Sequence, residues 1–199
     1  MARSRLSYAG RPALSVALTC SLACAAVMLC PREAYAGRFD LGIDGDATAI
    51  VAPASTATKL NDAGTGFKLR FGDQFRLRHG IRLTPEVGYA FDYLFPAGSD
   101  AGSQPWNMNR FFAGARLGFG RIVVPTIYAH VGVGFRSVGG PTNQLFPNST
   151  GVEFDTGVAV DFYLSRHFAI GPHVEFVDLD TTPNNPEWLA FGAHIDIVF

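Results

Sequence analysis

The chain ends with the stretch FGAHIDIVF, residues 191–199. Every second residue of this stretch, from Phe191 to Phe199, is apolar, and the residues between them are small or polar apart from Val198. Strict alternation indicates a β-strand with one face in an apolar environment, because successive side chains of a strand point to opposite sides. The same alternation recurs throughout the chain after residue 36, and no stretch there keeps a helical period. The sequence therefore predicts an all-β protein.

The N-terminal segment differs from the rest of the chain. Arginines near the start are followed by an almost unbroken apolar run over residues 12–30 and by the small-residue pattern Ala34-Tyr35-Ala36. These features are typical of a cleaved secretory signal peptide. We predict that residues 1–36 are removed and that residues 37–199 form one domain. A retained membrane anchor and a lipoprotein attached through Cys24 are the alternatives.

Composition narrows the classes of function. All three cysteines precede residue 37, so the mature chain can form neither a disulfide framework nor a thiolate metal site. Acidic residues outnumber basic ones after residue 36. Because nucleic-acid-binding domains are usually basic, we expect no nucleic-acid partner. No apolar run after residue 36 approaches the length of a spanning helix, so a membrane role would require strands.

Eight alternating segments are predicted as strands, and the connectors between them alternate in length. The predicted strands are residues 38–50, 64–75, 81–95, 108–119, 122–136, 152–164, 168–178 and 188–199. The connectors after the second, fourth and sixth strands are short, whereas the others are longer and rich in turn-forming residues. Short turns at one end and long loops at the other are typical of an outer-membrane barrel. We therefore predict an eight-stranded antiparallel up-and-down transmembrane β-barrel, since closure leaves no open sheet edge.

The two faces of the predicted strands differ in chemistry. One face is bulky and apolar, whereas the other mixes glycine and alanine with charges and lacks the Lys- and Glu-rich cover of a soluble surface. A soluble barrel would place the apolar face inside. We interpret the apolar face as lipid-facing and the polar face as the interior. The interior network is predicted to contain Lys68, Arg70, Glu86, Asp92, Arg110, Arg116, His130, Arg136, Asp155, Asp161, His173, Glu175, His194 and Asp196. Aromatic residues near the loop ends are predicted to form an interfacial girdle: Tyr93, Phe95, Trp106, Phe135 and Trp188.

These features together resemble the small outer-membrane β-barrel proteins of Gram-negative bacteria, the OmpA/OmpX-like group. The likeness covers residues 37–199 and rests on the export signal, the eight alternating segments and the terminal pattern. In that group a C-terminal Phe, preceded by apolar residues at alternate positions, is recognised by the barrel-assembly machinery. The resemblance therefore implies insertion into outer-membrane lipid as a monomer, with an assembly signal made by Phe191, Ile195, Ile197 and Phe199.

Few residues are candidates for catalysis, metal binding or anion binding, and each has a structural explanation. Lipid-modifying barrels need a serine beside a histidine, but only Ser165 has a near partner, His167, inside a predicted tight turn. His173 and His194 are weak candidates for a divalent metal site with neighbouring carboxylates, and membership of the interior network is favoured. No cofactor is expected. The arginine cluster over residues 76–82 is predicted to be a solvated periplasmic turn rather than a contact for an anionic partner.

The predicted function follows from the closed interior. An eight-stranded barrel is about wide enough for its own side chains to fill, so paired charges would plug it. We predict a non-enzymatic outer-membrane protein with a structural or surface-interaction role, in which loops 96–107 and 137–151 are available to a partner. The alternatives are a small porin-like channel or ligand-uptake barrel, a lipid-modifying outer-membrane enzyme, and a soluble exported barrel.

Overall fold

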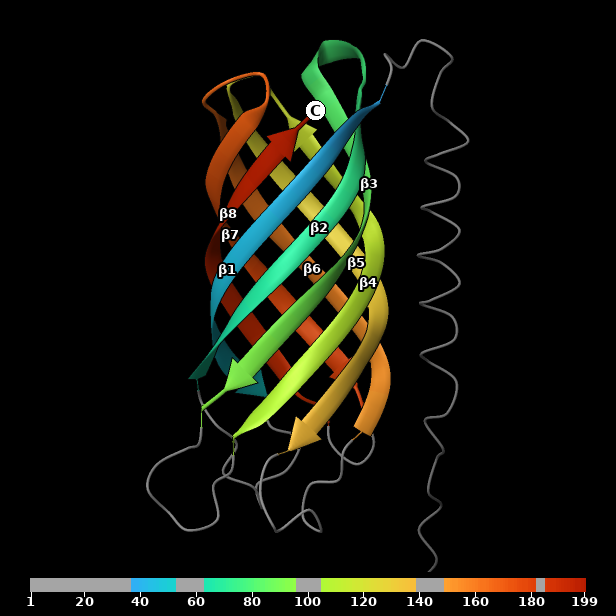
Figure 1. The fold of residues 1–199 in the computed structure, drawn as a ribbon, viewed down its shortest axis with the longest axis vertical. Coiled ribbons are helices and arrows are strands. Elements are labelled where there is room, and N and C mark those ends of the chain that lie inside the picture. The colour runs from blue at the N-terminus through green and yellow to red at the C-terminus, as the bar shows by residue number, and fades with distance from the viewer. Residues whose placement is uncertain (1–36, 53–62, 96–104, 139–148, 182–184) are drawn as a thin grey trace, which may run out of the picture. The chain divides into compact units, whose positions relative to one another are not determined.

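The structure is a computed structural model that describes residues 37–52, 63–95, 105–138, 149–181 and 185–199. The described residues form one antiparallel sheet that closes into a barrel, with neighbouring strands in sequence order (Figure 1). The strands are β1 (Arg38–Ala52), β2 (Ala63–Arg76), β3 (Ile81–Leu94), β4 (Trp106–Phe119), β5 (Val123–Val138), β6 (Ser149–Tyr163), β7 (Phe168–Asp180) and β8 (Glu187–Val198). The predicted eight-stranded antiparallel barrel is confirmed. No helix in the described part of the chain has the length and apolarity to cross a membrane. The predicted signal peptide lies outside the described residues.

Strand boundaries agree with the predicted ones to within a few residues. The largest difference is at the start of β6, which begins at Ser149 rather than at residue 152. Ser149 and Thr150 pair with Arg136 and Phe135 of β5. Pairing with a neighbouring strand therefore extends β6 through polar residues that alternation alone does not mark as strand.

The first and last strands close the barrel. Their antiparallel ladder runs from Asp40 opposite Val198 to Ala52 opposite Glu187. Beyond the ladder, the N–H of Phe199 donates a hydrogen bond to the carbonyl oxygen of Phe39 at 2.9 Å. The two phenylalanine rings lie 5.9 Å apart between centroids. Closure pairs both edges of the sheet, which removes the exposed edge that an open sheet would present.

Three short turns join β2 to β3, β4 to β5 and β6 to β7, at the end of the barrel where β8 also terminates (Figure 1). The first turn contains the 3-10 segment η1 (Arg78–Gly80), in which His79 and Gly80 have φ angles of 63° and 77°. In the second turn Gly120 has a φ of 130° and donates a backbone hydrogen bond to Gly80 at 3.0 Å. Glycine suits positions 80 and 120 because it adopts positive φ without steric cost.

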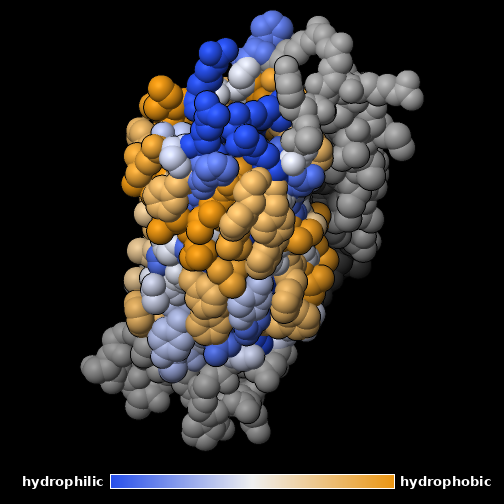
Figure 2. Space-filling model, turned by 45° about the horizontal axis from the view of Figure 1, so that its top comes forward, coloured by the Kyte–Doolittle hydropathy of each residue, from blue (hydrophilic) through white to orange (hydrophobic). Residues whose placement is uncertain are grey.

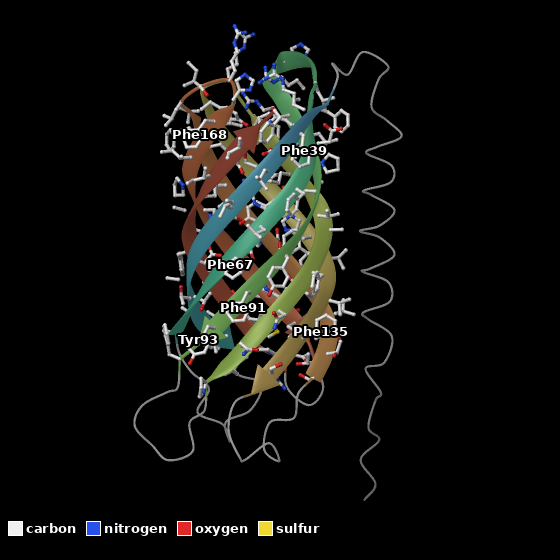
Figure 3. The ribbon with its side chains drawn as sticks, viewed as in Figure 1. Phe39, Phe67, Phe91, Tyr93, Phe135 and Phe168 are labelled. Atoms are coloured by element: carbon white, nitrogen blue, oxygen red, sulfur yellow. The ribbon has the colours of Figure 1, made fainter. Side chains whose placement is uncertain are left out.

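Apolar side chains cover the outside of the barrel. Figure 3 shows rings such as Phe67, Phe91 and Phe135 on the outer wall, and Figure 2 shows a hydrophobic zone beneath a hydrophilic cap. The outward-facing charged residues of the described strands are confined to strand ends: Asp73 near the short turns, and Asp178, Asp180 and Glu187 at the opposite end. The outside of the barrel therefore carries an uncharged band between two charged margins.

Polar and charged side chains fill the inside, except at the end opposite the short turns. There a buried apolar cluster contains Leu94, Trp106, Met108, Val177, Leu179 and Trp188. Trp106 and Trp188 were predicted to lie in an outer aromatic girdle, and this prediction is wrong. Both belong to the inward-facing set of their strands and are almost completely buried. Position near a strand end suggested an interfacial role, but strand alternation decides the direction of each side chain.

Candidate functional site

The network inside the barrel has Arg70 at one of its centres. From β2, Arg70 donates through Nε to Asp44 at 2.9 Å and through one terminal nitrogen to Asp44 at 2.7 Å and Asp196 at 2.8 Å. Its other terminal nitrogen lies 3.4 Å from Glu86. Gly42 of β1 makes room for this group, because a Cβ there would stand 2.5 Å from the guanidinium carbon. Alternating small residues thus allow one arginine to reach carboxylates from three other strands.

A second centre lies closer to the apolar cluster. Arg110 of β4 donates to Asp92 at 2.8 Å and to Glu153 at 2.5 Å, and it lies 3.5 Å from Glu175. Lys68 of β2 pairs with the same Glu175 from across the barrel. All five side chains are almost completely shielded from solvent. Such burial is tolerated only because each charge is paired and hydrogen-bonded.

His130 links the two centres. Its Nδ1 lies 2.5 Å from Asp155, which is also 3.6 Å from Lys68. Its Nε2 lies 2.7 Å from Glu86, the carboxylate that also contacts Arg70. The imidazole therefore connects both ion-pair groups into one network that spans the lumen, by which we mean the interior of the barrel.

The two histidines proposed as weak metal candidates lie next to each other. His173 and His194 stand on β7 and β8 with ring centroids 5.8 Å apart. They bind different carboxylates: His173 lies 2.5 Å from Asp46, and His194 lies 3.0 Å from Asp161. Glu175, the carboxylate suggested as a partner ligand, is instead engaged by Lys68.

In the described part of the chain one group has metal-ligand spacing, namely Asp161, His194 and Asp196, whose donor atoms lie within 4.8 Å of one another. Guanidinium groups already engage its carboxylates. Arg116 lies 3.5 Å from Asp161 and 3.7 Å from Asp196, and Arg70 lies 2.8 Å from Asp196. A divalent cation would compete with two fixed positive charges for the same oxygens, so the geometry favours the ion-pair network.

The residues predicted for the interior network are all buried within the barrel. Arg136 differs from the other cations, because no carboxylate of the described residues lies within ion-pair distance of it. The sequence interpretation omitted three acids of β1: Asp40, Asp44 and Asp46. Alternation in that segment places them on one face, so the signal for all three was present in the sequence.

Little space remains between the described side chains inside the lumen. The gap bounded by Asp44, Arg70, Glu86 and Arg116 is too small for a water molecule. A second space beside Asp40 and the short turns measures about 20 Å³, enough for about one water. The side chains therefore block the lumen rather than line an open path.

The serine and histidine considered for lipid hydrolysis do not form a nucleophile–base pair. The backbone N–H of His167 donates to the Ser165 hydroxyl oxygen at 3.1 Å. The His167 ring is directed elsewhere, with Nδ1 2.8 Å from the carbonyl oxygen of Val198. A general base must reach the hydroxyl proton through a ring nitrogen. This pair closes the turn and meets the last strand.

The terminal apolar residues form a row on the outer face of β8. Phe191, Ile195 and Ile197 all point outward, and Phe199 is 66% exposed despite its contact with Phe39. Their role as an assembly signal remains a prediction.

The rim opposite the short turns is acidic. Asp178 lies directly opposite Glu187 in the β7–β8 ladder, beyond the last apolar outward residue of β7. Burial, and then the charges of Glu187 and Asp180, raise the pKa of Asp178.

No protein-family model matches the chain, and no curated protein is similar to it in sequence. Solved structures nevertheless share its architecture. Neisserial surface protein A is 16% identical over 81% of this chain and 97% of its own, with a TM-score of 0.58. Ail, the attachment invasion locus protein of Yersinia pestis, was solved with the heparin analogue sucrose octasulfate; it is 12% identical over 82% of this chain and all (100%) of its own, with a TM-score of 0.50. At such identities the likeness establishes the fold alone, which is that of the small eight-stranded outer-membrane β-barrels.

Proposed function

We propose that this protein is a non-conducting, non-catalytic barrel of the outer membrane that anchors its longer loops for contact with a surface partner. The observation that carries the proposal is the filled lumen. Charged side chains from all eight strands cross it, and the apolar cluster around Trp188 covers its end opposite the short turns. A barrel filled in this way can position loops rigidly but offers little room for a solute.

The proposed membrane location is supported by the distribution of charge on the outer wall. Lipid-facing charges are costly near the middle of a bilayer and much less so at its interfaces. On the described strands the outward charges lie only at strand ends, and exposed side chains such as Phe67, Val87 and Phe111 lie between them. A soluble barrel has the opposite requirement, because water must cover its outer wall.

The expected partners follow from the same proposal. Outer-membrane lipid would surround the uncharged band, and the barrel-assembly machinery would recognise the outward row of β8. Loops 96–107 and 137–151 would meet a surface partner, with the barrel acting as a monomer. Most of both loops lies outside the described residues.

Conductance of the purified protein in a planar bilayer tests the closed lumen. We expect no stable steps under conditions in which a general porin conducts. Regular single-channel steps from the native barrel would support the channel alternative and contradict this proposal.

Location and catalysis require separate measurements. We expect the protein to fractionate with the outer membrane and to change its electrophoretic mobility in SDS only after heating, as closed barrels do. We also expect the mass spectrum of lipid A to be the same with and without the gene. Recovery in the soluble periplasm, or a gene-dependent loss of an acyl chain, would contradict the respective part of the proposal.

A further inference from the structure

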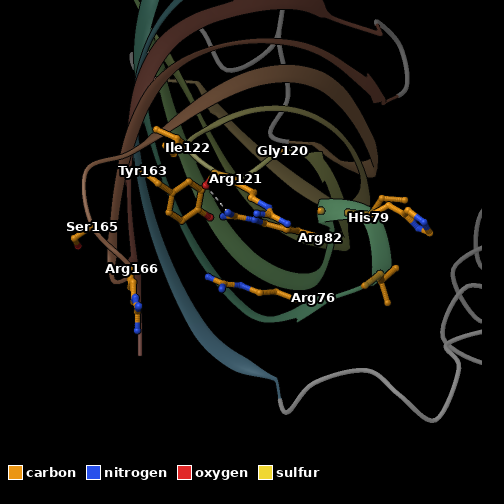
Figure 4. Close-up of a pocket in the computed structure, with 12 residues that line it drawn as sticks. Arg76, His79, Arg82, Gly120, Arg121, Ile122, Tyr163, Ser165 and Arg166 are labelled. Carbon is orange, nitrogen blue, oxygen red and sulfur yellow. Dashed lines mark hydrogen bonds between the residues drawn. The ribbon is translucent and has the colours of Figure 1, made fainter.

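A pocket of about 570 Å³ opens at the short-turn end of the barrel. It is formed jointly by the turns that follow β2, β4 and β6, and its walls include Arg76, Arg82, Arg121, Tyr163 and Arg166 (Figure 4). We call it the turn-end pocket. Its volume lies within the range typical of small-molecule sites, and it adjoins the filled lumen, because Arg82 and Tyr163 also line the small space beside Asp40.

The charge of the turn-end pocket has one sign. Among the described residues, four arginines and His79 line it, and no carboxylate does. Burial, and then the neighbouring charges of Arg82 and Arg38, lower the pKa of Arg76. Arginines crowded together without a counter-charge attract anions strongly, because a concave low-dielectric wall concentrates their field.

Arg82 is held in place while part of its guanidinium group is left without a partner. One terminal nitrogen donates to the carbonyl oxygen of Arg121 at 2.8 Å, as the dashed line in Figure 4 marks. The guanidinium carbon lies 3.9 Å above the ring of Tyr163, whose hydroxyl oxygen accepts a hydrogen bond from Gln74 at 2.9 Å. The other terminal nitrogen of Arg82 is buried and has no hydrogen-bond partner among the described residues. The side chain as a whole is only 8% exposed.

The arginines inside the lumen differ from Arg82 in their partners. Arg70, Arg110 and Arg116 each lie within 4.0 Å of at least two carboxylates. Arg82 lies within that distance of no carboxylate of the described residues. An unpaired buried donor is costly, and Arg82 shares this feature with Arg136 at the other end of the barrel. Of these two arginines only Arg82 lines the turn-end pocket, where a ligand would supply the missing acceptor.

We propose that the turn-end pocket binds a phosphate ester. The planar guanidinium group presents parallel donors that match phosphate oxygens. Arg121 and Arg166, both exposed at the entrance, contribute further positive charge. The pocket is much larger than a single phosphate, and Tyr163 with Ile122 offers an apolar wall to the organic part of an ester.

Two kinds of molecule could provide the phosphate ester that the turn-end pocket binds. One is the headgroup of an anionic phospholipid in the leaflet next to the short turns, and the other is a soluble phosphate ester. The soluble source does not depend on the proposed membrane location, so failure of one proposal does not entail failure of the other.

Calorimetric titration of the full-length mature barrel in a zwitterionic detergent tests the soluble source, with glycerol 3-phosphate and pyrophosphate as ligands and glycerol as the uncharged control. We expect saturable binding of the anions only. Arg82→Gln should weaken it by about ten- to a hundredfold, the loss typical of a charge-assisted hydrogen bond. Arg121→Gln and Arg166→Gln should each weaken it by a smaller factor, and both remain informative if Arg82→Gln fails to fold. Arg136→Gln, at the other end of the barrel, removes the same net charge and should leave binding unchanged.

Native mass spectrometry of barrels released from nanodiscs that contain equal phosphatidylglycerol and phosphatidylcholine tests the lipid source. Preferential retention of phosphatidylglycerol by the native barrel but not by Arg82→Gln would assign the ligand to the membrane. Saturable soluble binding without that retention would assign it to the aqueous phase. The proposal is overturned if neither binding is seen, or if Arg136→Gln weakens binding as much as the variants of the turn-end pocket do.

Discussion

Val158 and Thr150 share the outward face of β6 but lie at different depths. Val158 is at mid-strand and 55% exposed, whereas Thr150 is next to the strand end. Val158→Arg should lower the free energy of unfolding in lipid by about 2–4 kcal/mol, and Thr150→Arg by no more than about 1 kcal/mol, because the cost of a lipid-facing charge falls toward the interface. Denaturant titration of barrels refolded into vesicles measures both. Equal losses would contradict the assignment of the outer wall to lipid.

Arg70 neutralises carboxylates of three other strands. Arg70→Met should lower the stability of the barrel by about 3–5 kcal/mol, because it leaves buried acids without a counter-charge. Arg136→Met is the matched control, since that arginine is equally buried but has no carboxylate partner among the described residues. Arg136→Met should lower the stability of the barrel clearly less in the same titration. Similar losses for the two variants would show that bulk in the lumen, rather than charge pairing, supports the barrel.

Asp178 provides a test of pH dependence at the acidic rim. Its pKa is raised by burial and by Glu187 and Asp180, so the unfolded chain loses this proton at a lower pH than the folded barrel does. Stability therefore falls as pH rises from the ordinary pKa of about 4 through the raised value. Asp178→Asn should stabilise the barrel at pH 7 by about 0.2–1 kcal/mol, the size typical of one cross-strand pair interaction, because it removes the like charge opposite Glu187. The gain should vanish near pH 4, and an equal gain at both pH values would refute this explanation.

At the scale of the elements, the turn between β4 and β5 depends on Gly120. Its φ is 130°, and a Cβ at this position would lie 2.4 Å from the carbonyl oxygen of Val123. Gly120→Ala should therefore cost about 1–3 kcal/mol, the range for a residue forced into a sparsely populated backbone conformation. Gly45→Ala is the control, because a Cβ there meets nothing within 4 Å. It should be neutral or slightly stabilising. Urea or guanidinium titration compares the stabilities of the two variants. If Gly120→Ala left stability unchanged, the turn could change its conformation at no cost.

At the scale of the whole molecule, Phe199 belongs both to the proposed assembly signal and to the contacts that close the barrel. Deleting this residue removes one backbone hydrogen bond and one ring contact with Phe39, which together contribute about 1–3 kcal/mol. If the assembly machinery recognises Phe199, the amount of assembled barrel in cells should fall much further than this loss of stability accounts for. Heat-modifiable mobility measures the assembled fraction, and refolding in detergent measures stability.

Phe39→Ala separates the two effects. It removes the same ring contact from the other partner and leaves the terminal residue in place. Because it keeps the backbone hydrogen bond, it should lose somewhat less stability in detergent than the Phe199 deletion does, and it should assemble nearly normally in cells. Equal assembly defects in the two variants would show that closure of β1 against β8, rather than recognition of Phe199, limits assembly.

The sequence by itself determined the number of strands, their faces and the lengths of their connections. These features are local: side chains alternate with a period of two along any strand, and glycines such as Gly80 and Gly120 mark tight turns. That is why the inward position of Asp155 or Glu175 could be predicted without a structure. The acids of β1 were equally predictable from the pattern around Gly42 and were omitted only by the interpretation.

Only the tertiary structure decided which inward groups meet. Lys68 and Glu175 stand on β2 and β7, and their contact depends on the tilt and stagger of the whole closed sheet, which no local pattern encodes. The inward direction of Trp188 followed from its place in the alternation, but its burial required the other members of the apolar cluster. The turn-end pocket needs three separate turns to converge around Arg82. Its charge is visible in the sequence, whereas its concavity and the unpaired donor arise only when the barrel closes.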